Sequence, residues 1–357
     1  MKIVREAKRE DVYSPWKVVH LNEKIEALQR GELIVPQHIQ VDLTGRCNFN
    51  CVMCFYRNAG FEHLEFVQSE EIPLDIGVSL FDQMADLGVP ALELTGGGEP
   101  LLYPAIEKVL DRIAKRDLEL ALVTNGSLLT KRILDRIAKP KWIRFSIDSA
   151  TMETHNLIHK VRNQFSQVLG NLQNVVDNNF DDCEVGVSYI IQPSNYCEIV
   201  KAAELFKSIG VDNIRFSYAY TSKYDELLSE KERKEINILL SKAKKLETSD
   251  FKVFIMETRL DDFAPREKTF AFCGYQMFTF QIGCDSLVYP CCVLKYWKRY
   301  AFGDIRKQSL KEIALGEQRK TYVEEFDVND CLPCWLRHKN EFIEYLLVEN
   351  PAHLNFV

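Results

Sequence analysis

The chain has 357 residues, of which 46% are hydrophobic and 27% charged, the balance of an ordinary globular protein. This composition excludes disorder for the bulk of the chain, and the length favours two domains or one large domain with an extension. Asp and Glu outnumber Lys and Arg by 52 to 45, and the resulting net charge of −7 counts against a nucleic-acid partner. The sequence has neither a secretory signal nor a membrane-length apolar run, so we expect a cytoplasmic protein without a membrane partner.

Short apolar runs alternate with amphipathic stretches after an N-terminal extension at residues 1–36. The runs predict six strands, at Ile39–Leu43, Ala91–Thr95, Glu119–Thr124, Trp142–Ile147, Glu184–Ile191 and Asn213–Tyr218. Helical stripes lie between the strands, for example at residues 106–114 and 168–176. Six β–α units in a row predict an α/β fold, a partial (βα)6 barrel with its chemistry at the carboxyl ends of the strands.

The eleven cysteines are unevenly spaced, which indicates metal binding rather than a set of disulfides. The barrel is predicted to span residues 37–248, and a smaller domain with six of the cysteines to span residues 249–357. Directly after the first strand, Cys47, Cys51 and Cys54 form a C-x3-C-x2-C loop. Structural zinc and electron-transfer 4Fe–4S clusters take four protein ligands, so three thiolates on a cluster leave one iron open. Incidental cysteines and a zinc site completed by a distant ligand are the alternatives.

This loop, placed on the first strand of a βα barrel, resembles the signature of the radical S-adenosylmethionine (SAM) superfamily. The resemblance continues after the second strand, where Gly96-Gly97-Gly98-Glu99 is similar to the family's GGE motif. It implies that the three cysteines hold a 4Fe–4S cluster and that SAM binds at the open iron. The polar residues after the third and fourth strands, Asn125, Ser146 and Asp148, are then expected to contact SAM as well. A turn at Asn125 and a helix cap at Asp148 are the alternative interpretations.

The sequence departs from the family pattern at two positions. Met53 precedes the third cysteine, where the family usually has an aromatic residue. His159 stands where the family commonly has an Arg that pairs with the SAM carboxylate. We predict Arg162 for that role, because a guanidinium matches a carboxylate with two hydrogen bonds and stays charged.

The C-terminal cysteines resemble a second feature of the family, the auxiliary-cluster domain called SPASM or, when shortened, twitch. The resemblance implies one auxiliary 4Fe–4S cluster with four cysteine ligands: Cys273, Cys291, Cys331 and Cys334. Cys284 and Cys292 compete with Cys291 for one of these positions. A structural zinc site with four cysteine ligands is the alternative.

The resemblance also implies a reaction. An external one-electron reductant such as flavodoxin or ferredoxin supplies the electron that cleaves SAM, and the resulting 5′-deoxyadenosyl radical abstracts a hydrogen atom from a substrate. We predict a small polar substrate (a sugar, an aminocyclitol or a nucleotide) that is oxidised or epimerised with the help of the auxiliary cluster.

Several alternatives to this reaction remain open at the level of the sequence. Peptide modification is one, although residues 1–36 are too few for the leader-binding module of many peptide-modifying relatives. A non-catalytic iron–sulfur electron carrier and a zinc-binding module belong to other classes. If the enzyme inverts a carbon centre, Cys197 after the fifth strand is the predicted hydrogen-atom donor.

Overall fold

The computed structural model describes residues 14–58, 60–61, 64–178, 180–219, 221, 228–256 and 268–349. The first seven strands are β1 (His38–Asp42), β2 (Ala91–Thr95), β3 (Glu119–Thr124), β4 (Pro140–Ser146), β5 (Glu184–Ile191), β6 (Asn213–Tyr218) and β7 (Lys252–Ile255). They are followed by β8 (Thr279–Ile282), β9 (Leu287–Tyr289) and β10 (Gly303–Asp304). Over the described residues these strands form one sheet in the order β10-β9-β8-β1-β2-β3-β4-β5-β6-β7.

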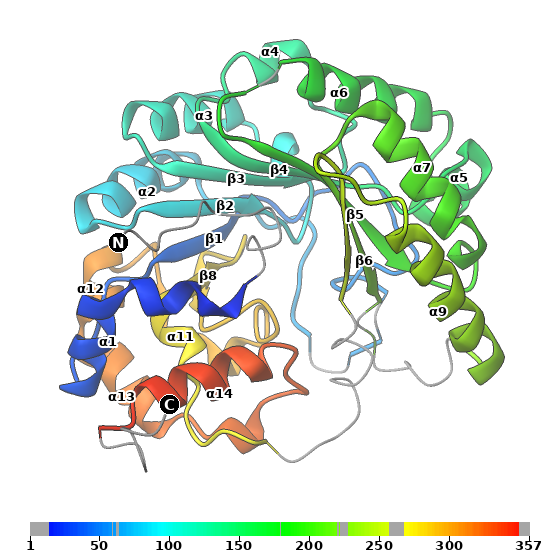
Figure 1. Cartoon of the computed structure of the whole chain (residues 1–357). Coiled ribbons are helices and arrows are strands. Elements are labelled where there is room, and N and C mark those ends of the chain that lie inside the picture. The colour runs from blue at the N-terminus through cyan, green and yellow to red at the C-terminus, as the bar shows by residue number, and fades with distance from the viewer. Residues whose placement is uncertain are drawn as a thin grey trace, which may run out of the picture.

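From β8 through β1 to β7 every adjacent pair of strands is parallel, whereas β9 pairs antiparallel with both β8 and β10. The predicted α/β partial barrel is therefore confirmed, and the six predicted strands correspond to β1 through β6. Two parallel strands, β7 and β8, extend it beyond the prediction, one on each side. The sheet curves but stays open, with β10 and β7 at its two edges (Figure 1).

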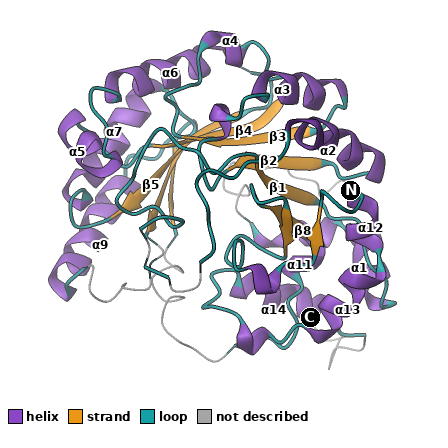
Figure 2. Cartoon of the chain, turned by 180° about the vertical axis from the view of Figure 1, so that it is seen from behind, coloured by secondary structure: helices purple, strands orange, loops and turns teal. Residues whose placement is uncertain are grey.

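Helices cover the outer face of this curved sheet, as Figures 1 and 2 show from opposite sides. Those of the barrel are α2 (Leu74–Leu87), α3 (Ile106–Lys115), α4 (Lys131–Leu134), α5 (Met152–His159), α6 (Phe165–Asn178), α7 (Ile199–Ile209) and α9 (Glu230–Lys244). In the expected stripe on α3, Ile106, Val109, Leu110 and Ile113 are buried, and full burial of each such aliphatic side chain contributes about 1.5–3 kcal/mol. A capping box between Ser229 and Glu232 fixes the start of α9.

The remaining helices lie near the β8 side of the sheet (Figure 1). They are α1 (Asn22–Gln29), α11 (Tyr275–Phe278), α12 (Leu310–Leu315), α13 (Glu317–Glu325) and α14 (Arg337–Leu346). Short 3-10 turns are found at Pro15–His20, Pro100–Leu102, Tyr196–Glu198, Lys298–Tyr300 and Val328–Asp330. Buried Arg319 ties this region together by donating to the carbonyl oxygens of Ile34 and Met277, among others.

The hydrogen-bonded sheet runs across the predicted domain boundary at residue 249. β7 pairs with β6, and β8 pairs with β1 in a register that sets Gln281 beside Gln40. Because these strands are parallel, the carboxyl ends of β8 and β1 lie at the same edge of the sheet. The division into an extension at 1–36, a barrel at 37–248 and a smaller domain at 249–357 stays a proposal. The two ends of the chain, residues 1–13 and 350–357, lie outside the described residues.

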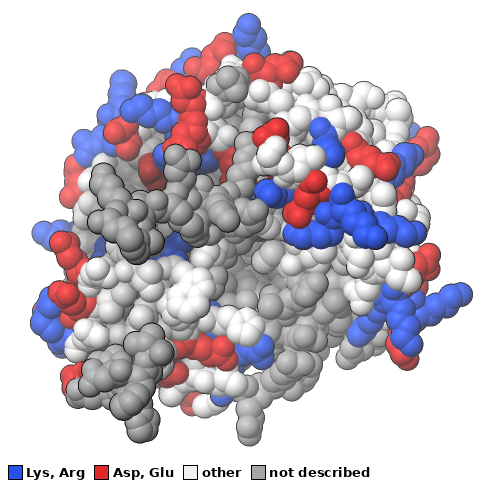
Figure 3. All heavy atoms as spheres, in the orientation of Figure 1, with Lys and Arg blue, Asp and Glu red and all other residues white. Residues whose placement is uncertain are grey.

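On the face shown in Figure 3, acidic and basic side chains of the described residues are interspersed along the rim. In the part of the chain that the structure describes, no helix is both long and apolar enough to cross a membrane.

Candidate active site

The segment that follows β1, residues 44–58, is named here the cysteine loop. Its three cysteines are partly buried and lie close enough for their charges to interact. Burial raises the pKa of the Cys47 thiol to about 11 and raises that of the Cys51 thiol well above its usual value. Metal coordination deprotonates such thiols outright, and the cationic iron compensates the buried negative charge. The three thiols therefore fit an iron–sulfur cluster better than they fit free thiolates.

The GGE motif after β2 is bonded directly to the cysteine loop. The backbone N–H groups of Gly98 and Glu99 donate to the carbonyl oxygens of Thr44 and Arg46, at 3.1 and 2.8 Å. A Cβ atom at Gly98 would lie only 2.1 Å from the Arg46 oxygen, so any larger residue would push the two loops apart. This close approach explains why the sequence has glycine here.

Glu99 is buried, and its carboxylate is hydrogen-bonded to other groups of the protein. The carboxylate accepts hydrogen bonds from the Thr124 hydroxyl at 2.7 Å, from the Asn125 N–H at 2.8 Å and from the Leu101 N–H at 3.2 Å. Burial raises its pKa to about 7, although these three bonds oppose the shift. Glu99 thus joins the carboxyl ends of β2 and β3, an arrangement that the sequence did not indicate.

Asn125 connects the end of β3 to the cysteine loop. Its side-chain NH2 group donates to Asn48 Oδ1 at 2.9 Å and lies 3.9 Å from Cys47 Sγ. Ser127 closes the network, because its hydroxyl donates to Asn125 Oδ1 and accepts from Asn48. Gly126, with φ +77°, makes the turn between them possible.

The end of β4 lies at the same edge of the sheet. Ser146 is its last residue, and buried Asp148 follows two positions later. One Asp148 oxygen accepts from the Ile190 N–H at 2.6 Å, and the other lies 3.6 Å from His159 Nε2. Burial raises the pKa of the Asp148 carboxyl to about 7.

His159 points into this site, whereas Arg162 is exposed. Nδ1 of His159 lies 3.1 Å from Cys51 Sγ, and burial lowers the imidazole pKa to about 3. Within the cysteine loop, the Arg57 guanidinium donates to the Phe49 carbonyl oxygen at 2.8 Å. Sequence analysis missed Arg57, although its position three residues after Cys54 was a usable signal.

The four C-terminal cysteines assigned to the auxiliary cluster line one small cavity, together with apolar side chains such as Tyr275 and Leu336. Its cysteines are Cys273, Cys291, Cys331 and Cys334. Cys284 lies elsewhere, buried with its sulfur 3.3 Å from the Tyr296 hydroxyl. The ammonium group of Lys268 donates to the carbonyl oxygens of Cys331 and Leu332, at 3.2 and 2.6 Å.

A buried ion pair that the sequence did not predict joins β1 to the C-terminal region. The Lys295 ammonium lies 2.8 and 2.7 Å from the two Asp42 carboxylate oxygens. The Tyr296 hydroxyl donates to Asp42 at 2.7 Å and also packs against Gly97. This pair lies at the carboxyl end of β1, immediately before the cysteine loop.

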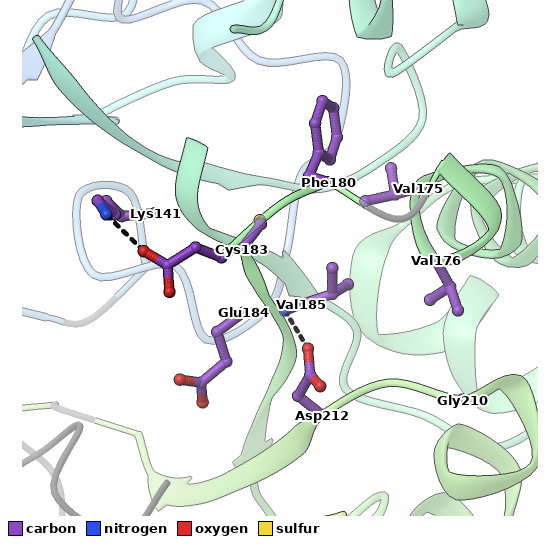
Figure 4. Close-up of a pocket in the computed structure, with 10 residues that line it drawn as sticks. Lys141, Val175, Val176, Phe180, Cys183, Glu184, Val185, Gly210 and Asp212 are labelled. Atoms are coloured by element: carbon purple, nitrogen blue, oxygen red, sulfur yellow. Dashed lines mark hydrogen bonds and ion pairs between the residues drawn. The ribbon is translucent and has the colours of Figure 1, made fainter. Parts of the chain in front are cut away.

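Three cysteines remain: Cys292 packs against the apolar cluster that contains Cys291, whereas Cys183 and Cys197 precede and follow β5. Cys197 is exposed, on the turn at Tyr196–Glu198 that follows β5, and its role as a hydrogen-atom donor stays a prediction. Cys183 lines a cavity of about 560 Å³ at the amino end of β5 (Figure 4). Charged side chains that line this cavity are already bonded to neighbouring groups of the protein. Lys141 donates to Asp182, and Asp212 accepts a hydrogen bond from the Val185 N–H.

Within the described residues, no three Cys, His, Asp or Glu side chains converge closely enough to hold a single metal ion. A 4Fe–4S cluster is several ångströms across and spaces its thiolates more widely than one ion does. The two groups of cysteines, each gathered in one place, fit such a cluster.

Residues 41–206 match the radical SAM superfamily, and residues 273–335 match the SPASM family, an iron–sulfur cluster-binding domain. The chain therefore contains a radical SAM domain followed by a SPASM domain. The first implies a SAM-binding 4Fe–4S cluster and SAM itself, and the second implies an auxiliary cluster. Radical SAM enzymes take their electrons from an external reductant.

Among its radical SAM relatives, the AdoMet-dependent heme synthase of Methanosarcina barkeri is 31% identical over 49% of this chain and 48% of its own length. The subtilosin biosynthesis protein AlbA of Bacillus subtilis is 27% identical over 54% of this chain and 41% of its own length. The chain thus spans about half, or less, of the length of these curated relatives.

The fold is shared with Streptococcus suis SuiB, solved with its precursor peptide SuiA, at 14% identity and a TM-score of 0.62. That match covers 95% of this chain and 78% of SuiB.

Proposed function

We propose that this radical SAM protein holds its SAM-binding cluster on Cys47, Cys51 and Cys54 and abstracts a hydrogen atom from a polar substrate. The observation that carries the proposal is the backbone bonding between the cysteine loop and the GGE motif, which sets three partly buried thiols beside the glycines of the motif. When bound, the cluster supplies the electron that splits SAM into methionine and a 5′-deoxyadenosyl radical.

The chain's own residues hold and shield this site. A Cβ atom at Gly96, Gly97 or Gly98 would meet protein atoms, so these glycines let the GGE motif fold tightly against its surroundings beside the cysteine loop. Ser146 and Asn125 offer hydroxyl and amide groups at neighbouring strand ends. Asp148, with a pKa raised by burial, offers a carboxyl oxygen to a ligand donor. Because Arg162 is exposed, we propose Arg57 rather than Arg162 as the cation nearest the SAM carboxylate.

We further propose that the auxiliary cluster is ligated by the four cysteines that line the C-terminal cavity. Four protein ligands leave no iron open, so this cluster is suited to electron transfer rather than to substrate ligation. Burial raises the pKa of the Cys331 thiol to about 11, and the Lys268 ammonium, which donates to the Cys331 carbonyl oxygen, opposes this shift.

A polar substrate suits the inner face of the barrel. Gln40 donates to Glu93 at 2.9 Å across β1 and β2, and Arg215 donates to Ser188 at 3.3 Å across β6 and β5. Such hydrogen-bonding side chains on a barrel interior favour sugar-like, aminocyclitol or nucleotide substrates over apolar ones.

A peptide is the second candidate substrate, and a specific observation favours it. The match to SuiB, which was solved with a precursor peptide, extends over nearly the whole chain, including its SPASM region. The match to AlbA, a bacteriocin biosynthesis protein, covers 54% of the chain.

Substrate-dependent SAM cleavage tests the proposal. Reconstituted protein is incubated anaerobically with SAM and reduced flavodoxin, and 5′-deoxyadenosine is measured with and without each substrate class. We expect a polar small molecule to accelerate its release. Acceleration by peptides alone would replace the small-molecule assignment, whereas intact SAM in every arm would refute the radical SAM function.

A further inference from the structure

His159 occupies the last position of α5 with its imidazole 1% exposed, between the cysteine loop and the end of β4. Its Nδ1 atom lies 3.1 Å from Cys51 Sγ. Its Nε2 atom faces Asp148 Oδ2 at 3.6 Å and has no hydrogen-bond partner among the described residues. A buried imidazole against this sulfur is not explained by the SAM contacts discussed above.

The backbone fixes the cysteine loop against the same helix end. The N–H of Asn50 donates to the carbonyl oxygen of His159 at 3.0 Å, and the N–H of Val52 donates to that of Ile158 at 2.9 Å. These two bonds flank Cys51 on both sides. The ring of Phe49 packs on the imidazole with a centroid distance of 5.4 Å. The distance between His159 and Cys51 is therefore held by several contacts rather than by one flexible side chain.

We propose that His159 is a positioning residue that donates an Nδ1–H hydrogen bond to the Cys51 thiolate and thereby raises the reduction potential of the SAM-binding cluster. The inference rests on the proposed function, because it takes Cys51 as a cluster ligand. It adds a determinant of electron transfer that lies outside the cysteine triad and the GGE motif.

The position of the proton follows from the chemistry of the two partners. A coordinated thiolate has only lone pairs to offer, so the imidazole atom that faces it must carry the hydrogen. A neutral imidazole has one N–H, and Nε2 is then the acceptor that faces Asp148. A ligand hydroxyl or a protonated Asp148 carboxyl can supply the donor that Nε2 lacks.

The direction of the effect follows from charge. Reduction adds an electron to the cluster and makes its sulfur ligands more electron-rich, so a hydrogen bond to sulfur stabilises the reduced state more than the oxidised state. Hydrogen bonds to the sulfurs and solvent exposure are established determinants of cluster potential. The low dielectric around a buried pair strengthens the effect.

Redox titration of the full-length reconstituted protein tests the inference. The midpoint potential is followed by EPR, and the SAM-binding cluster is recognised by the change of its signal when SAM is added. We expect His159→Leu to shift this potential to a more negative value. His159→Asn, which keeps an N–H group near the position of Nδ1, is expected to retain most of the wild-type potential.

His155→Leu provides the matched control. His155 is buried on the same helix and stacks on His159 with a centroid distance of 4.4 Å, but its Nδ1 atom contacts Ser149 instead of a cysteine. An unchanged potential in His159→Leu, or equal shifts in the Leu variants of both histidines, would overturn the role of His159 and leave the proposed function intact. A wild-type protein without a SAM-sensitive cluster signal would refute both.

Discussion

Replacing Lys295 by Met should destabilise the folded chain by about 3 kcal/mol, the lower end of the cost of leaving a buried charge without its partner. Asp42 is 0% exposed and Lys295 is 1% exposed, so water cannot replace the lost ammonium group. The Tyr296 hydroxyl still donates to Asp42 at 2.7 Å, which is why the lower end applies.

Two further variants separate burial of charge from loss of packing. In the double variant Asp42→Asn/Lys295→Met no charge remains, so we expect it to recover most of the lost stability. The exposed pair of Lys139 with Asp117 is the control, because Lys139→Met should cost less than about 1 kcal/mol. Urea unfolding of anaerobically prepared protein, followed by circular dichroism, measures all three. A loss in Lys295→Met no larger than that of the control would refute the reasoning.

Three more predictions follow from the site. Replacing any one of the three loop cysteines by Ala should abolish 5′-deoxyadenosine formation while circular dichroism stays unchanged; wild-type cleavage in any of them would contradict the ligand assignment. Replacing Cys331 and Cys334 together by Ala should remove about half of the iron measured colorimetrically, since one of two 4Fe–4S clusters is lost. Unchanged iron would disprove the auxiliary site. Because burial raises the pKa of Glu99 from 4.5 to about 7, its folded form retains a proton that the unfolded form releases. The Glu99 contribution to the unfolding free energy of cofactor-free protein should therefore fall by about 3 kcal/mol as the pH rises from 4.5 to 7, and Glu99→Gln should reduce the pH slope by that amount.

Most of the barrel could be predicted from the sequence because its strands are short apolar runs between turn residues. The run at residues 184–191, for example, is strand β5 without any shift. β8 was missed because its four residues, Thr279–Ile282, include polar side chains that face the barrel interior rather than an apolar core. Its pairing with β1, some 240 positions earlier in the chain, depends on tertiary contacts that no local pattern records.

The candidate site, too, could be predicted only in part from the sequence. The order of motifs along the chain, together with the rule that parallel strands end at one edge, predicted that the cysteine loop, Glu99 and Asp148 lie near one another. The direction of each side chain could not be predicted. Glu99 turns toward β3, His159 turns inward to Cys51, and Asp42 finds a partner at Lys295, 253 positions away.

The central claim is that this chain uses an open-iron cluster to cleave SAM, and one anaerobic experiment tests it most directly. Iron and sulfide are quantified in reconstituted protein, which is then incubated with SAM and dithionite. The account predicts about eight irons per chain, four for each cluster, and release of 5′-deoxyadenosine. Zinc in place of iron, or SAM that remains intact in an iron-loaded protein, would contradict it.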